Sequence, residues 1–549
     1  MLRPAPCVFL VVLFAAAAEA QSPAIRLHGV VNAASFAAPG LPNGSIAQGS
    51  LFTIFGSALG PDPGVSASKF PLGTALAGVS ISISQGSTQV AAIPVFVGAG
   101  QINALMPSNA PLGWVSLRVL HNNAGSNYSP VFVVHDSPGV FSFTGTGLGP
   151  SALQNYLSAT NTPVNSLQAA ANPGQTEILY VTGLGPISSP DADAPPVGNL
   201  ATPVEVWVGG VPATVTYSGR SPCCSGLDQI DFVVPNSAPQ GCWVPVSVRT
   251  NHATVSNFVS MAIGAKGSAC SDSSNAAAAS VAHGGSLGQL TLTRMAIHED
   301  VGVNAPIDVT DDFLGFTATQ QIGGEFAFAP FVSLPPPGSC TVYPGVGDFF
   351  ETTNVPQAST VSAQLDAGTQ FQVNAEAKQV SVPLIGTGGP IGSFLPLYSL
   401  PNTLFLSPGD YTVKSSGGAK VASFQATITM PAPLVWTNRD ETTNVPRNQP
   451  LTLNWSGGGS GQTVVILGAD SDLPTNSSAV FICNSGSGAN SFTVPPEVLS
   501  AIPATRPDVL RSKSAIYVIG NVDTPFSAPG LQTAISSAVY ATGKTVVFQ

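Results

Sequence analysis

Cysteine is the residue type whose spacing in this sequence most directly predicts chemistry. Seven cysteines occur. Cys7 lies in the predicted signal peptide described below, so six remain, four of them at 223, 224, 242 and 270. An even number of cysteines in an exported chain suggests disulfides. Cys242 opens a predicted strand, and Cys270 lies just past the end of that strand's predicted hairpin partner. The spacing therefore predicts a Cys242–Cys270 bridge and leaves Cys223 and Cys224 as a vicinal pair that can bridge each other, with strain.

A second connectivity stays open, because four cysteines allow three pairings. In it, Cys224 pairs with Cys242 and Cys223 pairs with Cys270. A bridge that closes the 29-residue span from 242 to 270 would stabilise the fold by about 3–4 kcal/mol in the chain-entropy model. The sequence assigns no partner to Cys340 or Cys483.

The segment HGGSLG at 283–288 contains the G-x-S-x-G pattern of serine hydrolases. In those enzymes the serine sits on a tight turn between a buried strand and a helix. Here the neighbouring residues predict neither a strand before Ser286 nor a helix after it, and the chain lacks a strand–helix–strand pattern. We expect a linker at this point, and a hydrolase that uses Ser286 as its nucleophile is the remote alternative.

Metal ligands are sparse. The six histidines form no zinc spacing such as H-E-x-x-H, and His121 and His252 fall in predicted hairpin turns. Acidic pairs at 191/193, 311/312 and 470/472 could supply Ca²⁺ ligands if further oxygens converged on them. Local turn chemistry explains these aspartates as well. No cofactor and no metal site is predicted.

Tryptophan supplies the remaining candidates, because an exposed indole can stack on a sugar ring. Trp114 and Trp243 follow the turn glycine of two similar segments, while Trp207 and Trp455 lie within apolar strand patterns. These settings favour core packing. Exposed aromatic residues on one sheet face or loop rim would instead favour a carbohydrate-binding protein. The five tryptophans are Trp114, Trp207, Trp243, Trp436 and Trp455.

Trp114, Trp207 and Trp243 sit within an internal repeat. The segment GQINALMPSNAPLGWVSLRV at 100–119 is similar to LDQIDFVVPNSAPQGCWVPVSV at 227–248, and Gln101, Ile102 and Pro107 recur 128 positions later. Upstream, GSLFTIFGSALGP (49–61) aligns without a gap with GQTEILYVTGLGP (174–186). Short apolar runs separated by Gly, Pro, Asn and Asp are typical of antiparallel β-sandwiches. The two units should share one fold.

The order of these motifs resembles the IPT/TIG family of immunoglobulin-like domains. More closely, it resembles the paired repeat of uncharacterised secreted acidobacterial proteins. The resemblance covers about residues 27–264. It implies immunoglobulin-like sandwiches that serve display, adhesion or spacing, and it implies no catalytic residue.

Farther along, NTLFLSPGDYTVKSSGG (402–418) resembles the tyrosine corner of Greek-key sandwiches, in which the hydroxyl bonds back to the corner's backbone. Tyr411 would play that part. An ordinary turn with a half-buried tyrosine is the alternative.

Composition and the N-terminus indicate the compartment. Residues 1–20 combine Arg3, an apolar run and a final A-x-A, which predicts a signal peptide. That run is too short to span a bilayer, and no later stretch is long enough. Charged residues make up only 8% of the chain and the net charge is −11, with no basic run. Nucleic acid and anionic membranes are therefore excluded as expected partners.

We therefore expect an exported, all-β protein built of tandem immunoglobulin-like β-sandwiches. Its predicted function is non-catalytic binding, adhesion or spacing at the cell surface or outside the cell, with the periplasm also open, and its partner is an unknown protein or polysaccharide. The alternatives are carbohydrate binding and the Ser286 hydrolase. The predicted divisions are a signal peptide (1–20), repeat 1 (25–140), repeat 2 (141–268), a linker (269–288) and two further sandwich domains (289–432 and 433–549).

Overall fold

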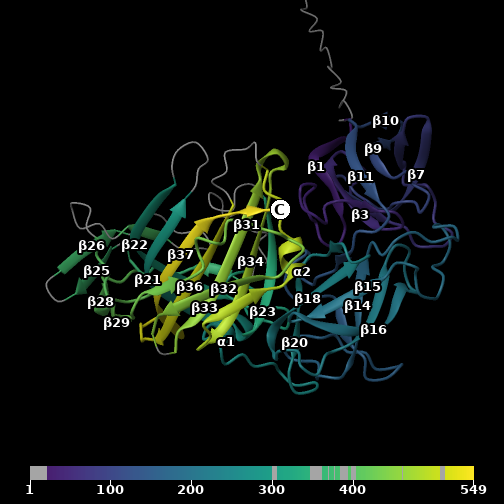
Figure 1. The fold of residues 1–549 in the computed structure, drawn as a ribbon. Coiled ribbons are helices and arrows are strands. Elements are labelled where there is room, and N and C mark those ends of the chain that lie inside the picture. The colour runs from purple at the N-terminus through teal and green to yellow at the C-terminus, as the bar shows by residue number, and fades with distance from the viewer. Residues whose placement is uncertain are drawn as a thin grey trace, which may run out of the picture.

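The computed structural model describes residues 22–299, 306–346, 361–368, 370–375, 378–383, 393–396, 404–459, 461–506 and 514–549. Nearly all regular structure in this part of the chain is β-strand (Figure 1), with two short helices, α1 (Ala278–His283) and α2 (Pro496–Ser500), and one 3₁₀ turn, Leu473–Thr475. The predicted all-β fold is confirmed. The predicted signal peptide at 1–20 lies outside the described residues. None of the described helices has the length and apolar character needed to cross a bilayer.

Repeat 1 is a β-sandwich in which the long strand β7 belongs to both layers. Its main strands run in the spatial order β1-β3-β8-β7-β6-β9-β11. They are β1 (Ala24–Asn32), β3 (Leu51–Ser57), β6 (Val79–Gln85), β7 (Thr88–Val97), β8 (Gln101–Leu105), β9 (Gly113–His121) and β11 (Ser129–Val134), with short additions β2 (Ile46–Ala47), β4 (Val65–Ser66), β5 (Ala75–Leu76) and β10 (Ala124–Gly125).

Repeat 2 has the same strands in the same order, with β12-β14-β17-β16-β15-β18 followed by β20 on the outer side of β18. The strands are β12 (Gly139–Val140), β14 (Thr176–Thr182), β15 (Val204–Val208), β16 (Val211–Arg220), β17 (Asp228–Val233), β18 (Gly241–Thr250) and β20 (Val259–Ile263), with β13 (Leu153–Asn155) and β19 (Thr254–Val255) at the margins. The prediction that the two units share one fold is confirmed.

The register agrees with the sequence alignment. Ile102 pairs with Ile54 in repeat 1, and Ile230 pairs with Leu179 in repeat 2. Both long strands also carry a bulge at the same place, between Pro94 and Phe96 in β7 and between Val215 and Tyr217 in β16. A bulge bends a strand and lets it pass from one layer of a sandwich to the other.

An asparagine latches the first strand of each repeat. In repeat 1, Asn127 accepts a hydrogen bond from the Ile25 amide (2.7 Å) and donates to the Ile25 carbonyl (3.1 Å). In repeat 2, Asn257 makes the same two bonds with Val140, at 2.8 and 2.9 Å. The side chain thus replaces a pair of ladder bonds on the edge of the first strand that faces away from its partner strand, β3 or β14.

The C-terminal half does not form the two successive domains that were predicted at 289–432 and 433–549. Its large sheet has the order β23-β34-β33-β36-β37-β21-β22-β24 and takes strands from both predicted domains. One pairing inside this sheet is parallel, between β21 and β37. Local strand patterns show where a strand lies but carry no information on such distant partners. The strands are β21 (Gly285–Glu299), β22 (Ile307–Gln321), β23 (Ser339–Val346), β24 (Val361–Gln364), β27 (Ser393–Pro396), β33 (Thr463–Asp472), β34 (Ser477–Ser487), β36 (Ala515–Pro525) and β37 (Thr533–Thr545).

Smaller sheets pack on this large sheet, and their apolar residues join one core with it. We call the whole assembly the C-terminal body. The smaller sheets contain β25 (Gln370–Ala375), β26 (Lys378–Pro383), β28 (Gly409–Ser415) and β29 (Phe424–Met430), then β30 (Leu434–Trp436), β32 (Leu451–Gly457) and β35 (Ser491–Val494), and the pair β31 (Asn444–Val445) and β38 (Val547–Phe548).

The predicted linker at 269–288 is also ordered and packed. Helix α1 occupies its middle, and β21 begins at Gly285. Ala278 and Val281 are buried, and the helix packs on β21 and β22. Small residues suggested a flexible linker, but here they allow a short helix to lie close against a sheet.

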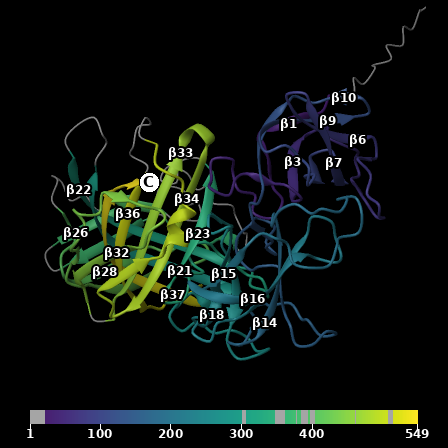
Figure 2. The ribbon, with the colours of Figure 1, turned by 45° about the vertical axis from the view of Figure 1, so that its right-hand side comes forward.

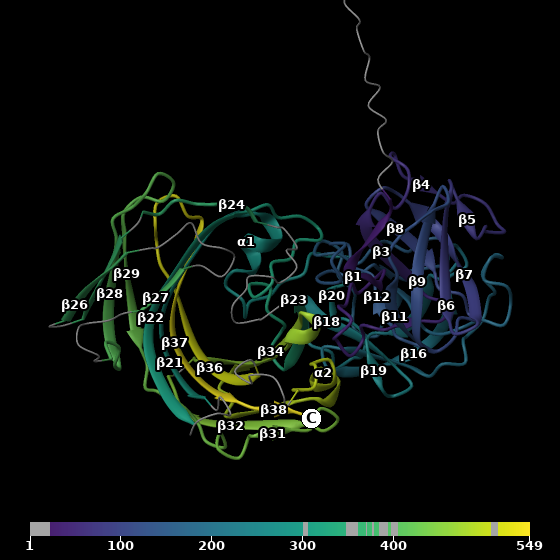
Figure 3. The same cartoon turned by 90° about the horizontal axis from the view of Figure 1, so that it is seen from above.

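The two repeats sit side by side at one end of the molecule, next to the C-terminal body (Figures 2 and 3). Strand β18 of repeat 2 faces β23, while α2 contacts β19 and β23. Repeat 2 therefore contacts the body, and one of its sheet faces is covered.

Candidate functional site

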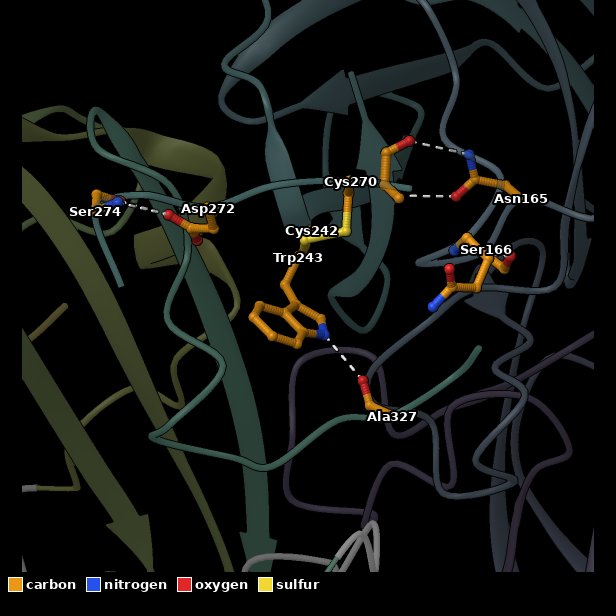
Figure 4. Close-up of a disulfide and its surroundings, with 10 residues drawn as sticks. Asn165, Ser166, Cys242, Trp243, Cys270, Asp272, Ser274 and Ala327 are labelled. Carbon is orange, nitrogen blue, oxygen red and sulfur yellow. Dashed lines mark hydrogen bonds between the residues drawn. A yellow bond between two sulfur atoms is a disulfide. The ribbon is translucent and has the colours of Figure 1, made fainter. Parts of the chain in front are cut away.

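The covered face of repeat 2 explains its tryptophan. Trp243 immediately precedes Val244, whose side chain lies in the core of the repeat, so the indole points outward. The C-terminal body lies on that outward face. Trp243 is only 2% exposed and donates from Nε1 to the Ala327 carbonyl at 3.0 Å (Figure 4). It packs in one cluster with Phe328 and Tyr343.

The matching face of repeat 1 has no such cover. Trp114 precedes the buried Val115 as Trp243 precedes Val244, yet Trp114 is 65% exposed. Phe132 lies directly across from it on β11, edge-on with ring centroids 5.1 Å apart, and is itself 40% exposed. The equivalent surface is therefore buried in one repeat and open in the other.

Polar groups border these two rings. Arg118 lies on β9 four residues after Trp114, and its guanidinium is 5.0 Å from the ring centroid of the exposed Tyr128. Ser116 stands between Trp114 and Arg118 on the outward side of the strand. We name Trp114, Ser116, Arg118, Tyr128 and Phe132 the repeat 1 aromatic face. It combines flat apolar rings with hydrogen-bond donors on one sheet.

The core-packing prediction was therefore wrong for Trp114. It holds for Trp243, Trp436 and Trp455, which are buried, whereas Trp207 is half-buried with the Arg249 guanidinium 4.4 Å from its ring. The sequence did contain a signal for Trp114, because Val115, Leu117 and Val119 alternate with it and take the core side. What covers the outward side is decided elsewhere in the chain. Arg118, Tyr128 and Phe132 were not among the residues predicted from the sequence.

The structure joins Cys242 to Cys270, the pairing expected from the hairpin, with Cα atoms 5.2 Å apart. The bridge lies next to Trp243 (Figure 4) and ties the exit of repeat 2 to its β18. Cys223 and Cys224 bridge each other in the exposed loop before β17. The alternative pairing of Cys224 with Cys242 and of Cys223 with Cys270 is therefore wrong.

A third bridge joins Cys340 to Cys483, which face each other across β23 and β34 with Cα atoms 4.0 Å apart. The sequence analysis assigned these two no partner. Their separation of 143 positions leaves no local pattern to indicate it. All six described cysteines are thus in disulfides.

The loop that carries Cys223 and Cys224 also forms the seam between the repeats. Arg220 and Asp228, at its two ends, form a fully buried ion pair, and Arg220 also donates to the Gly185 carbonyl at 2.7 Å. The Thr182 hydroxyl connects the units. It accepts a hydrogen bond from the Leu51 amide of repeat 1 and donates one to the Gly226 carbonyl of this loop. The bond from Leu51 to Thr182 joins the two repeats, while the ion pair and the other bonds hold the loop in place within repeat 2.

Ser286 does not sit on a nucleophile elbow. It lies inside β21, 8% exposed, and helix α1 precedes it instead of following it. Its Oγ accepts a hydrogen bond from the Gln532 amide at 2.9 Å. The residue ties two strands together, so the geometry required for a Ser286 hydrolase is not present.

The paired aspartates bond to groups of the protein itself. Asp191 accepts from the amide and the hydroxyl of Ser108, each at 2.7 Å. Asp312 receives two bonds from Arg294, at 2.8 and 2.9 Å, and Asp470 accepts from a threonine hydroxyl. Within the described part of the chain, no three His, Cys, Asp or Glu side chains gather in a way that could hold a metal ion.

His121 and His252 lie in or beside the tight turns that close the two corresponding hairpins, with His252 at positive φ. The Tyr411 hydroxyl accepts from the Ser407 amide (2.7 Å) and donates to the Ser407 carbonyl (3.1 Å). Those bonds match the tyrosine-corner interpretation and not an ordinary turn.

Comparison with known proteins gives no family. No family model matches the chain, and no curated protein does. Among solved structures, domains 5–6 of the S-layer protein SbsC are similar over 44% of this chain and 98% of that chain, at 13% identity and a TM-score of 0.17.

The glucan-utilization protein SGBP-B of Bacteroides ovatus, solved with a mixed-linkage heptasaccharide, is similar over 83% of this chain and 87% of that chain, at 10% identity and a TM-score of 0.13. The I9–I11 tandem of titin covers 70% of this chain and 94% of its own, at 7% identity and a TM-score of 0.12. Such low TM-scores support no inference about ligand or activity.

Proposed function

We propose that this chain is a non-catalytic protein of the cell surface or extracellular space, and that it acts by binding through the repeat 1 aromatic face. One observation carries the proposal. Trp114 and Trp243 occupy equivalent positions, but only Trp243 is covered by the protein's own C-terminal body. A face of this sandwich that docks another surface in repeat 2 is left open in repeat 1.

The three disulfides support the compartment, because such bonds persist in oxidising surroundings outside the cytosol. The predicted signal peptide agrees with export. The likeness of residues 27–264 to IPT/TIG-like paired repeats is a proposal on the same footing, supported by the common strand order of the two units. Together these points favour a displayed or secreted binding module.

Polysaccharide is the ligand class that the face fits best. Exposed aromatic rings combine a flat apolar surface with low conformational entropy, which suits contact with the apolar side of a sugar ring. Ser116 lies two residues after Trp114 on the outward side of β9, and Arg118 comes two residues later, beside Tyr128; both can donate hydrogen bonds to sugar hydroxyls. A protein partner is the second candidate, favoured by the docking of the matching face in repeat 2 against a protein surface.

Sedimentation with insoluble polysaccharides tests both candidates. The purified mature chain is mixed with cellulose, chitin or cell-envelope material, and the bound fraction is measured for wild type, Trp114→Ala and Phe132→Ala. We expect binding to at least one glycan and a loss of about tenfold or more in the variants. Tyr156→Ala removes another exposed aromatic residue, in repeat 2, and should bind like wild type.

Undiminished glycan binding by both variants would show that this face is not the site. Recovery of envelope proteins but no glycan, again dependent on Trp114, would favour the protein partner.

A further inference from the structure

A pocket of about 160 Å³ lies where repeat 2 meets the C-terminal body. Repeat 2 contributes Trp207 and Ser247, and the body contributes Phe492 and Glu497. A water molecule occupies roughly 30 Å³ of liquid, so the space suits a small organic molecule. Small-molecule sites occur preferentially at such junctions between domains.

Glu497 brings to the pocket a carboxyl group that is negative when ionised. It lies in α2, is 6% exposed and lines the pocket. The charged groups near it are Arg249 and Glu205, which pair with each other at 2.6 Å, and His252, which bonds to Glu205 at 3.0 Å. One guanidinium therefore lies near two carboxyl groups and pairs with Glu205, so an ionised Glu497 has no counter-ion of its own.

Ser247 adds a polar group that the protein leaves unused. It pairs across the ladder with Trp207, so both side chains project from the same outward face of repeat 2. Ser247 is 1% exposed, and its hydroxyl has no hydrogen-bond partner. A buried hydroxyl without a partner costs free energy, and a ligand that bonds to it recovers that cost.

Aromatic rings form the remaining walls. Phe258 is 4% exposed, and Phe492 and Trp207 are half-buried at the pocket. The Trp207 ring already carries the Arg249 guanidinium, 4.4 Å from its centroid. Ring faces attract cations, and they do so more strongly where water is excluded.

We propose that this pocket binds a small organic cation: a primary ammonium group on a short aliphatic stem. The ammonium is the counter-ion for the ionised Glu497 carboxylate and can donate one N–H to Ser247. The stem lies against the phenylalanine and tryptophan rings. An alcohol of the same size would leave the charge of Glu497 unbalanced. A carboxylate of the same size would add a second negative charge to it.

The pH dependence of binding follows from the same group. Burial raises the pKa of Glu497, with Arg249 acting in the opposite direction. A bound ammonium favours the ionised carboxylate, so binding should release a proton when Glu497 is protonated in the free protein. Affinity should therefore fall as the pH is lowered through the titration of Glu497.

Isothermal titration calorimetry of the full mature chain tests the proposal with three isosteric probes: butylammonium, 1-butanol and butyrate. We expect butylammonium to bind at least tenfold more tightly than 1-butanol, and butyrate to give no heat of binding. Glu497→Gln should weaken butylammonium at least tenfold, and Ser247→Ala should weaken it severalfold. The control Glu441→Gln removes an exposed carboxylate and should leave binding unchanged.

Equal binding of butylammonium and 1-butanol, or undiminished binding by folded Glu497→Gln, would overturn the proposal. If Glu497→Gln fails to fold, the pH profile of the wild type decides, because a flat profile is incompatible with a titrating carboxylate at the site. Trp114→Ala should bind butylammonium normally, so the outcome is independent of the function proposed for repeat 1.

Discussion

Glu177, a buried carboxylic acid in repeat 2, makes the stability of the protein depend on pH. Glu177 occupies the position that Phe52 holds in the core of repeat 1, by the alignment of 49–61 with 174–186. It is fully buried, and it receives one hydrogen bond, from the Gln175 amide at 2.8 Å, while its Oε2 has no partner. Burial raises its pKa to about 9.

The consequence for stability has a definite sign. Above the ordinary pKa of 4.5 the unfolded chain releases this proton, but the folded chain keeps it up to about pH 9. Glu177 therefore costs stability increasingly as the pH rises from about 4.5 to about 9. We expect Glu177→Gln, which cannot ionise, to match wild type near pH 4 and to raise Tm by several degrees at pH 8. Thermal unfolding across this pH range measures it. Equal pH slopes for the two proteins would contradict the assignment, and Glu441→Gln should keep the slope of the wild type.

Disulfides show which residue contacts a sequence can predict. The Cys242–Cys270 bridge followed from hairpin geometry, because the end of one strand returns beside the start of the other. Cys340–Cys483 joins strands whose pairing depends on the topology of the whole body. The exposure of Trp114 was missed for a related reason. Alternation predicts which side of a strand a residue takes, but burial on the outer side depends on distant segments.

At the scale of the element, the asparagine latch is the device that completes each sandwich. Strand β12 of repeat 2 has only two residues and pairs with β14, so Asn257 supplies much of what holds it on the opposite side. Asn257 also donates to the Gly147 carbonyl at 2.7 Å, whereas Asn127 of repeat 1 holds a longer first strand. The latch in repeat 2 should therefore matter more.

We expect Asn257→Ala to destabilise the protein by about 1–3 kcal/mol, because buried backbone groups of Val140 lose their partners. Asn127→Ala should cost less. Urea unfolding gives the free energies, and hydrogen exchange should show faster exchange at the amides of Val140 and Ile25 in the respective variants. Equal protection of Val140 in Asn257→Ala and wild type would show that the latch is not needed.

The common fold of the two repeats was predictable at this scale, and for a physical reason. Two copies of the same pattern of strands and turns predict the same arrangement twice, and the structure gives both copies the same strand order. The C-terminal half offers a single copy of each strand. Its apolar runs predicted strands, but which strands pair depends on one core that contains residues of both predicted domains.

For the whole molecule, the C-terminal body should behave as one cooperative unit across the boundary that the sequence suggested at 432/433. Strand β21 pairs along most of its length with β37, and Ser280 bonds to Thr533 at 2.7 Å, 253 positions away. The Cys340–Cys483 bridge links the two sides covalently. Ala432 is exposed between β29 and β30, so a protease site inserted after it should be tolerated and accessible.

Cleavage at that inserted site should leave a nicked protein whose halves stay together. On a non-reducing denaturing gel it should run as one species, because the disulfide spans the cut, and reduction should release two fragments. Gel filtration of the nicked and reduced protein without denaturant should still give one peak, since the parallel pairing of β21 with β37 and the shared core remain. Separation of the halves on that column would mean that 289–432 and 433–549 are independent domains after all. The same cleavage with Cys340→Ser and Cys483→Ser distinguishes the contribution of the sheet from that of the bridge.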